Sequence, residues 1–215
     1  MEILHGLTNN STNEEIKELV FNQISKIRWM SFATNGLDGL PSNRIFDFTK
    51  LEDGNIYFIT ADGKPVYDEL KEFPVGMITA YYGKWIMFKV QVHVNEISDL
   101  KLLDEFYKCN PGTKALYINS PETVKMFTFT KGQGELLHLF KDDAIARVKF
   151  AWGDIDKKPA RYVINDNCIS CGKCEKVCTS NAVVTGEPYS IDEFHCLECG
   201  SCYNVCTENA IIQQK

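Results

Sequence analysis

The chain has 215 residues, of which 44% are hydrophobic, and it carries a formal net charge of −6. This length and apolar content favour a buried core and two domains, whereas the acidic balance disfavours nucleic acid as a partner. No run of about 18 consecutive apolar residues occurs, so we expect neither a membrane-spanning helix nor a membrane partner. The first residues lack the apolar core of a signal peptide, so we expect a cytoplasmic protein.

The first predicted element is a helix that begins near Thr12. Thr12 and Glu15 form a capping box, and apolar residues then recur on one helical face. From Trp29 onward, short apolar runs alternate with turns rich in Gly, Asp and Asn, a pattern typical of β-strands. The predicted strands cover residues 29–34, 40–48, 55–60, 75–81, 85–96, 126–130 and 135–140.

Two more helices are predicted between these strands. Pro65 suits the first position of a short helix, where its missing N–H is harmless, and the helix should end near residue 73. Ser98 is expected to cap another helix, which ends at Asn110 and is followed by loops. Cys109 near that end is expected to be a buried apolar residue. The pattern predicts a mainly β fold with helices (α+β), built on a small closed or split β-barrel.

Four segments of this region carry a resemblance to a known family. They are Ser-Asn-Arg-Ile-Phe-Asp-Phe at 42–48, Asp-Gly-Asn-Ile-Tyr-Phe-Ile-Thr at 53–60, Gly-Lys-Pro-Val-Tyr-Asp-Glu-Leu at 63–70, and Gly-Lys-Trp at 83–85. Over roughly residues 12–140 the chain resembles the pyridoxamine 5′-phosphate oxidase-like FMN-binding split barrels. The oxidases themselves have Ser-Arg-Lys where this chain has Asp-Gly-Lys, so vitamin B6 oxidation is not the expected reaction.

The resemblance implies a set of FMN-binding residues. In the family, a strand arginine and a lysine at a helix start hold the FMN phosphate, and a threonine at a strand end lies beside them. Backbone groups next to the arginine face the isoalloxazine ring. Carried over to this sequence, these residues are Arg44, Lys64, Thr60, Ile45 and Phe46. The family also implies a homodimer with FMN in the cleft between two barrels. A helix start with nearby cationic donors is in any case favourable for a phosphate.

Eight of the nine cysteines fall in two runs with the same spacing, C-x2-C-x2-C-x3-C. The runs are Cys168, Cys171, Cys174, Cys178 and Cys196, Cys199, Cys202, Cys206. In such pairs of runs, the first three cysteines of one run and the last of the other hold one cube-shaped cluster. We therefore expect two [4Fe–4S] clusters. One is held by Cys168, Cys171, Cys174 and Cys206, and the other by Cys196, Cys199, Cys202 and Cys178.

The other possible roles of these cysteines are zinc binding and disulfides. Zinc sites usually present separated C-x2-C pairs, and disulfides need an oxidising compartment, so the spacing favours clusters. From about residue 164 to the end, the chain resembles a bacterial two-cluster ferredoxin. Thr179 and Thr207 stand where proline usually follows the fourth cysteine. We expect a split-barrel domain over residues 1–150, a linker over 151–163 and the ferredoxin-like domain over 164–215, with 142–162 as connecting chain.

These observations predict an oxidoreductase that passes electrons between [4Fe–4S] clusters and FMN, to reduce or oxidise an unidentified acceptor or donor, with a small molecule as one possible substrate. The alternative is a non-catalytic electron carrier or redox sensor. No G-x-G-x-x-G fingerprint of a nicotinamide-binding domain occurs, so we expect a redox protein partner such as a ferredoxin or a reductase. No catalytic side chain can be assigned, because the cofactors would carry the chemistry.

Overall fold

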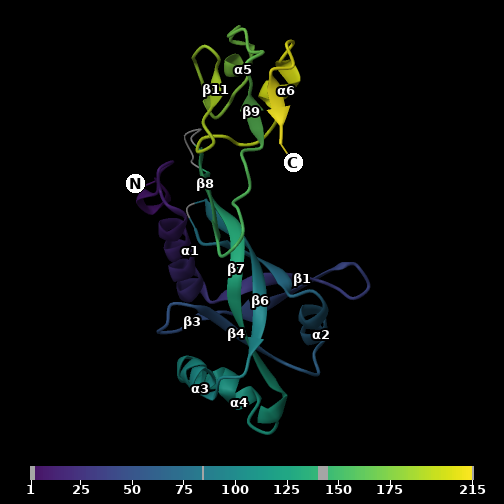
Figure 1. Cartoon of the computed structure of the whole chain (residues 1–215). Helices are drawn as coiled ribbons and strands as arrows, with labels where there is room; N and C mark the ends of the chain where they lie inside the picture. The colour runs from purple at the N-terminus through teal and green to yellow at the C-terminus, as the bar shows by residue number, and fades with distance from the viewer. Residues whose placement is uncertain (1–2, 84, 140–144, 215) are drawn as a thin grey trace.

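The computed structural model describes residues 3–83, 85–139 and 145–214, and a large antiparallel sheet forms its centre (Figure 1). The strands follow one another in the order β2-β1-β5-β6-β7-β4-β3, and β8 also pairs with β7. Their bounds are β1 (Trp29–Asn35), β2 (Pro41–Asp47), β3 (Thr49–Lys50), β4 (Ile56–Ala61), β5 (Val75–Tyr81), β6 (Ile86–Ile97), β7 (Val124–Leu139) and β8 (Ile145–Trp152).

Strand β7 is what curls the sheet. Its first part, up to Thr128 opposite Tyr57, pairs with β4, and its second part, from Gly132 opposite Trp152, pairs with β8. Residues 126–138 also pair with β6, apart from a bulge between His93 and Val94. One long strand thus serves two different neighbours, and the result is the curled mainly β fold expected from the sequence.

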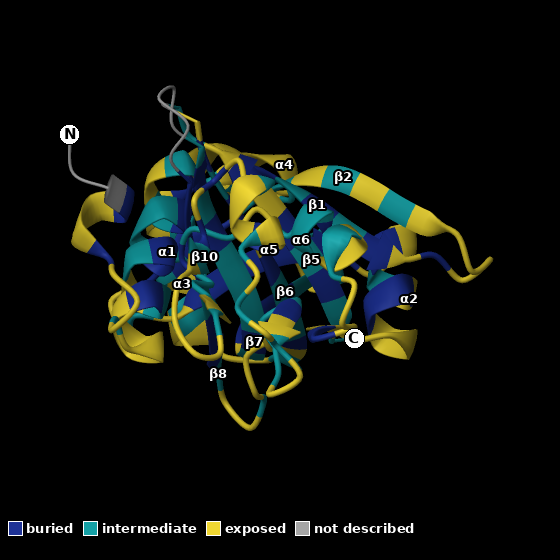
Figure 2. Cartoon of the chain, turned by 90° about the horizontal axis from the view of Figure 1, so that it is seen from above, coloured by how far each residue is buried: buried dark blue, intermediate teal, exposed yellow. Residues whose placement is uncertain are grey.

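The core lies on the inner face of this sheet. The predicted alternation on β6 is confirmed, because Phe88, Val90, Val92 and Val94 are all buried there. Phe32, Phe48 and Phe58 pack edge to face, with ring centroids 5.4–5.5 Å apart. Figure 2 shows the strands largely buried or intermediate and the β1–β2 hairpin loop exposed. Packing of large aromatic rings therefore supplies much of the apolar contact that holds the curled sheet together.

Helices close the edges of the sheet. Helix α1 (Asn13–Ile27) begins with the predicted capping box of Thr12 and Glu15, and α2 (Pro65–Glu72) has proline in its first turn as predicted. Helices α3 (Leu100–Cys109) and α4 (Pro111–Leu116) lie at one end of the molecule (Figure 1). The 3₁₀ turns are η1 (Ile3–Gly6) and η2 (Pro121–Thr123). None of the described helices is long and apolar enough to cross a membrane.

The cysteine-rich region lies at the opposite end of the molecule from α3 and α4 (Figure 1). It has two small antiparallel pairs, β9 with β12 and β10 with β11, and its own core around Tyr162, Cys174 and Ile211. The bounds are β9 (Tyr162–Ile164), α5 (Lys173–Lys176), β10 (Val183–Val184), β11 (Ser190–Ile191), α6 (Ser201–Val205) and β12 (Ile211–Gln213). This ferredoxin-like region thus has a separate, smaller core.

The ferredoxin-like region is docked on β8. Phe194 is part of the large core, and its carbonyl oxygen accepts a 2.7 Å hydrogen bond from the Arg147 amide. Glu198 pairs with both Arg147 (2.7 Å) and Lys149 (2.8 Å), and Lys149 also pairs with Glu193 at 2.9 Å. The contacts come from the residues around Cys196, so the second cysteine run is the one held against the sheet.

The structure corrects the interpretation of residues 142–162 as connecting chain, because residues 145–152 form β8. Arg147 and Lys149 make this strand look polar in the sequence, yet their side chains are only 6% and 7% exposed. The two predicted strands 126–130 and 135–140 are a single strand over their described residues. Gly132 and Gly134 resemble a turn, but a Cβ there would lie 2.4 Å and 2.7 Å from carbonyl oxygens of β6. These glycines allow close strand approach.

Three smaller predictions around α3 are also wrong. Asp99, and not Ser98, caps α3, because its side chain accepts hydrogen bonds from the amides of Lys101 and Leu102. The chain after Asn110 forms α4 where we predicted a loop. Cys109 is exposed and not buried, at the last residue of α3.

Candidate cofactor sites

The cysteines gather around two small cavities in the ferredoxin-like region. One is lined by Cys168, Cys171, Cys174 and Cys206, and the other by Cys178, Cys196, Cys199 and Cys202. In each cavity, three cysteines of one run thus lie together with the last cysteine of the other run, which is the grouping expected from the spacing. All nine cysteines are described and all are free thiols, so none is in a disulfide.

Backbone geometry repeats between the two runs and directs amides at the sulfurs. The amides of Ser170 and Glu198 point to the Sγ atoms two residues earlier, at 3.4 Å and 3.3 Å. Ala182 and Ala210 do the same four residues after Cys178 and Cys206, at 3.2 Å and 3.3 Å. Amide donors of this kind stabilise sulfur that carries negative charge, as it does when it binds iron.

The left-handed residues of the two runs occur at equivalent positions. Positive φ angles occur at Ser170, Gly172 and Asn181 in the first run and at Glu198, Gly200 and Asn209 in the second. A left-handed residue reverses the chain locally, so the amides can turn towards the cysteines. The short helices α5 and α6 begin directly after the glycines. Each run therefore has the same local fold, as the sequence repeat predicts.

The thiols differ in how readily they lose a proton. Burial raises the pKa of Cys202 to about 11, and it also raises the pKa of Cys174 and Cys196. Hydrogen bonds instead lower the pKa of Cys168, chiefly from the Ser170 amide, and of Cys199, chiefly from the Ser201 side chain. The buried thiols would need the positive charge of iron to become ligands. Among the described residues no three His, Cys, Asp or Glu side chains converge on a single-ion site. Each cysteine set surrounds a space, as the cube of a [4Fe–4S] cluster requires.

A second kind of site is formed by residues of β1, β2, β4, α2, α3 and α4. It is a cavity of about 460 Å³. Its lining residues are Trp29, Ser42, Arg44, Ile45, Phe46, Asp47, Ile59, Lys64, Pro65, Val66, Phe106, Thr113, Leu116 and Tyr117. Four of the five residues expected to bind FMN are therefore together at one cavity of the size that ligand sites usually have.

Arg44 is positioned by a buried acidic network. Its guanidinium forms a 2.7 Å ion pair with Glu69 on α2 and donates hydrogen bonds to Thr34 and Ser42. The Thr34 hydroxyl also donates to Glu69, at 2.5 Å. Burial alone would raise the pKa of Glu69, but these hydrogen bonds and the charge of Arg44 lower it below its ordinary value. Arg44 is thus fixed in place, with part of its charge neutralised by Glu69.

Lys64 stands at the start of α2, where its ammonium is less constrained. It occupies the N-cap position without a side-chain cap, and Pro65 follows it. Its Nζ donates to the Tyr117 hydroxyl at 2.7 Å and lies 5.2 Å from the centre of that ring. No described carboxylate pairs with Lys64. A free cation at the N-terminus of a helix is a suitable place for a phosphate.

Thr60 differs from the other four expected residues, because it does not line the cavity. It is 1% exposed, and its hydroxyl has no hydrogen-bond partner among the described residues. A buried hydroxyl without a partner costs free energy unless something else accepts its bond. The fit to a phosphate-bearing cofactor such as FMN therefore rests on the two residues that do line the cavity, Lys64 at a helix start and the fixed Arg44.

The sequence did not reveal the far wall of this cavity. Thr113, Leu116 and Tyr117 come from α4 and the residue after it, which we had predicted to be loop. The available signal was Pro111, which occupies the first turn of α4 just as Pro65 does in α2. Asn110 binds the Thr49 hydroxyl and the Phe106 carbonyl, and it accepts from Arg28, so α4 is firmly anchored.

Comparison with known proteins supports an iron–sulfur region. A family model described as a 4Fe-4S binding domain matches residues 161–184. A ferredoxin of Acetoanaerobium sticklandii is 59% identical over 32 residues, and the 4Fe-4S ferredoxin FdxA of Gottschalkia acidurici is 56% identical over 32 residues. Each match covers 14% of this chain and 57% of the relative, so the chain spans little more than half the length of these curated relatives.

Solved structures resemble the sheet region. PhzG from Burkholderia lata 383, in complex with tetrahydrophenazine-1-carboxylic acid, is 13% identical, with a TM-score of 0.56 over 74% of this chain and 95% of that chain. A NimC/NimA family protein from Clostridium acetobutylicum is 17% identical, with a TM-score of 0.52 over 62% and 94%. A pyridoxinephosphate oxidase family protein of the same organism is 14% identical, with a TM-score of 0.49 over 62% and 92%. The chain thus joins a sheet region with the fold of PhzG and of the NimC/NimA family protein to a C-terminal region that resembles ferredoxins and contains a 4Fe-4S binding domain.

Proposed function

We propose that this protein is an FMN- and iron–sulfur-dependent oxidoreductase with two [4Fe–4S] clusters per chain. The observation that supports it most is the presence, in one chain, of two cavities each lined by four cysteines and a third cavity lined by Arg44 and Lys64. Bound FMN would link the one-electron chemistry of clusters to two-electron chemistry on a small organic molecule. A redox protein partner would supply or take up electrons at the clusters.

The residues of the chain would position these groups and would not react themselves. Lys64 would bind the phosphate with the free amides at the start of α2, and Arg44 would add a second cationic donor from β2. Ile45 and Phe46 line the same cavity, where their backbone could face the flavin ring. In the ferredoxin-like region, the amides of Ser170 and Glu198 would donate to ligand sulfur. These donors would help to set the reduction potential.

A homodimer is part of this proposal. Three large apolar side chains, Trp29, Ile45 and Tyr81, are 60–64% exposed on β1, β2 and β5, which are neighbouring strands of the sheet. Trp29 and Ile45 also line the flavin cavity. An exposed apolar patch of this kind is often a contact surface, and a second copy would close the open side of the cavity.

The position of the clusters favours the same assembly. Successive cross-strand partners connect the flavin cavity to β8 along one row, which runs Ile45, Ser31, Thr79, Lys89, Glu135 and Lys149. With strands about 4.8 Å apart, the five steps of this row cover about 24 Å. In a two-fold dimer the ferredoxin-like region of one chain could lie nearer to the partner's flavin than to its own. Light scattering of FMN-loaded protein tests the dimer, and a stable monomer that keeps FMN would contradict it.

FMN retention by charge variants tests the flavin site. Lys64→Gln should weaken FMN binding about 10-fold or more, because charge-assisted hydrogen bonds contribute about 1.5–3 kcal/mol. Arg44→Gln alone would leave Glu69 buried and unpaired, so the double variant Arg44→Gln/Glu69→Gln is the cleaner test. The matched control is Lys71→Gln, which removes an exposed charge at the other end of α2. Wild-type affinity in both test variants would place the phosphate elsewhere.

Turnover separates the enzyme from an electron carrier or redox sensor. The reduced, FMN-loaded protein should transfer electrons to small organic acceptors in a steady state when a reductant is supplied. An absence of turnover with a broad panel of acceptors, together with fast electron exchange with a ferredoxin, would instead support the carrier.

A further inference from the structure

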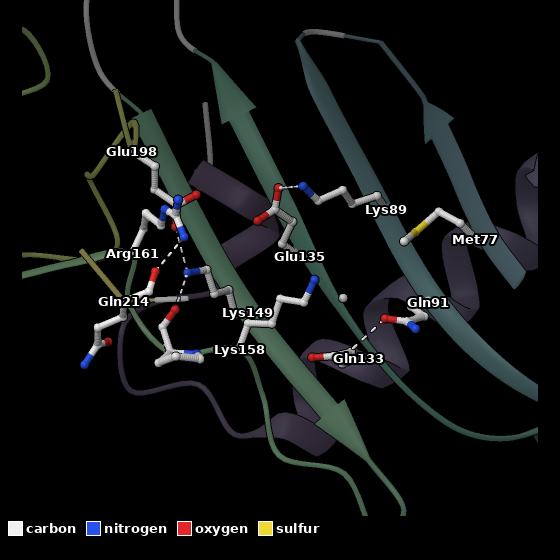
Figure 3. A pocket seen from close by; sticks show the side chains of 12 residues that line it. Met77, Lys89, Gln91, Gln133, Glu135, Lys149, Lys158, Arg161, Glu198 and Gln214 are labelled. Atoms are coloured by element: carbon white, nitrogen blue, oxygen red, sulfur yellow. Dashed lines mark hydrogen bonds and ion pairs between the residues drawn. The ribbon is translucent and has the colours of Figure 1, made fainter. Parts of the chain in front are cut away.

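A third type of cavity lies where the sheet, the linker and the ferredoxin-like region meet (Figure 3). Its volume is about 350 Å³, and no residue that lines it also lines the flavin cavity. Its charged lining residues are Lys89, Glu135, Lys149, Lys158, Arg161 and Glu198. It depends on the fusion of the two parts, because Lys158 and Arg161 follow β8 and Glu198 belongs to the second cysteine run.

Both carboxylates of the cavity are already neutralised. Glu135 pairs with Lys89 at 3.0 Å and with Arg147 at 2.9 Å. Glu198 pairs with Arg147 at 2.7 Å and with Lys149 at 2.8 Å. Burial alone would lower the pKa of Lys149, but its hydrogen bonds to carboxylates raise it, so this lysine is charged at neutral pH. These residues, together with Glu193 bound to Lys149, therefore form a connected set of ion pairs at the wall of the cavity.

Lys158 and Arg161 are outside this set of ion pairs. Neither forms an ion pair with any carboxylate in the described part of the chain, although Arg161 donates to the Gln214 carbonyl oxygen at 2.6 Å. Figure 3 shows the Lys158 side chain extending into the cavity, with its amine pointing towards the middle. Within the described part of the chain, the cavity thus has two positive charges without a carboxylate partner, in a chain whose net charge is −6.

The floor of the cavity can accept an organic molecule. Gln133 donates to the Gln91 side chain at 3.3 Å, which leaves the amide nitrogen of Gln91 and the amide oxygen of Gln133 for other partners. Met77 adds an apolar surface, and Gly134 has no side chain to fill the space. Ligand sites commonly combine a few polar groups of this kind with apolar contact.

We propose that this cavity binds a small organic anion, with its carboxylate or phosphate group held by Lys158 and Arg161. Glu198 lines both this cavity and the cavity of the second cysteine set, so the bound anion would lie beside the second cluster. A site there would take a substrate or an effector close to the electron-carrying group. The proposal does not depend on FMN, because the two cavities share no residue.

The test is a calorimetric titration of the full-length protein, reconstituted with iron and FMN, at low ionic strength. The probes are succinate and inorganic phosphate, and glycerol is the neutral comparison. We expect saturable binding of at least one anion, weakened about 10-fold by Lys158→Gln and restored in large part by Lys158→Arg. The probe that binds with the higher affinity shows whether the site prefers a carboxylate or a phosphate group. The control is Lys157→Gln, which removes the same charge one residue away, outside this cavity.

Three results would overturn the proposal. The first is the absence of saturable binding of both anions to folded protein, with folding checked by thermal unfolding. The second is an equal loss in Lys157→Gln and Lys158→Gln, which would mean general attraction to a basic segment. The third is loss of anion binding when FMN is added to flavin-free protein, which would make the cavity part of the flavin site. The first two results would leave the predicted effect of Lys64→Gln on FMN affinity unchanged.

Discussion

The two cysteine runs have the same local structure but different surroundings. Both have left-handed residues at equivalent positions, amides directed at sulfur, and a short helix after a glycine. Among the hydrogen bonds and ion pairs of the described residues, the second run is the one bound to the sheet, through Phe194 and the ion pairs of Glu198. The contacts described for the first run stay within the ferredoxin-like region. Local sequence therefore determines the cluster loops, whereas residues of β8 determine which of them faces the sheet.

The largest expected effect concerns the exchange of the fourth cysteine between the runs. If the two sets are those seen in the structure, Cys171→Ala/Cys206→Ala removes two ligands from one set and leaves the other complete. About four of eight irons should then remain. Cys171→Ala/Cys178→Ala removes one ligand from each set, so no complete set remains and most iron should be lost. Iron analysis and cluster spectroscopy of anaerobically reconstituted protein measure both.

The two double variants should show the opposite pattern of iron loss if each run holds a cluster by itself. If each run held its own cluster, Cys171→Ala/Cys178→Ala would keep half of the iron and Cys171→Ala/Cys206→Ala would lose most of it. Because both variants change two cysteines, they control for each other. If Cys171→Ala/Cys178→Ala keeps half of the iron and Cys171→Ala/Cys206→Ala loses most of it, the result contradicts the arrangement of the cysteines in the structure.

The sequence was sufficient for features that depend on neighbouring residues. The capping box at Thr12, the proline that begins α2 and the alternation on β6 were all predicted correctly. The family resemblance also singled out four residues that line one cavity in the structure, namely Arg44, Ile45, Phe46 and Lys64. These successes share a cause, because the spacing of a few residue types is enough to determine a turn, a face or a helix start.

The predictions that failed concern features that depend on contacts between residues distant in sequence. Residues 145–152 were predicted as connecting chain, and no neighbouring residue reveals that Arg147 is buried, because its partner Glu198 is 51 residues away. The predicted strands stop on either side of Gly132, because the β6 carbonyl that requires a glycine there is 41 residues earlier, at Gln91. Glu69 was not recognised as the partner of Arg44 for the same reason. Tertiary contacts of this kind leave no local pattern in a single sequence.

The next largest effect concerns docking of the second run. Arg147→Met removes a buried cation that pairs with Glu135 and Glu198, so the free energy of unfolding should fall by about 3 kcal/mol. The linker should also be exposed more often, and a protease should cut residues 153–161 faster than in the wild type. Thermal unfolding and limited proteolysis of the reconstituted protein measure these effects.

The first run offers the matched control for Arg147→Met. Lys173→Met removes an exposed cation that contacts only the Thr207 hydroxyl, at 3.1 Å, among the described residues. Its effect on unfolding should be below about 0.5 kcal/mol, and the rate of linker cleavage should not change. Equal effects of Lys173→Met and Arg147→Met would show that the ion pairs on β8 do not hold the region in place.

The smallest effect compares the equivalent glycines Gly172 and Gly200. Both have positive φ, so alanine should cost about 1 kcal/mol or slightly more at either position. A Cβ at Gly172 would have no neighbour closer than 3.9 Å, whereas at Gly200 it would lie 2.8 Å from the Tyr162 hydroxyl. Gly200→Ala should therefore be more destabilising, by a further 1 kcal/mol or so, because Tyr162 is buried and cannot move freely.

A second substitution separates the contact from the backbone strain. Tyr162→Phe removes the hydroxyl, after which the nearest ring atom to the new Cβ lies at 3.4 Å, an ordinary contact distance. The extra cost of Gly200→Ala should then disappear in the double variant, while the cost of Gly172→Ala stays the same in the Tyr162→Phe background. Chemical denaturation of the four variants and their parents measures this coupling. If Gly200→Ala costs no more than Gly172→Ala, the two runs would differ only in their docking on β8, and not in the packing of their own loops.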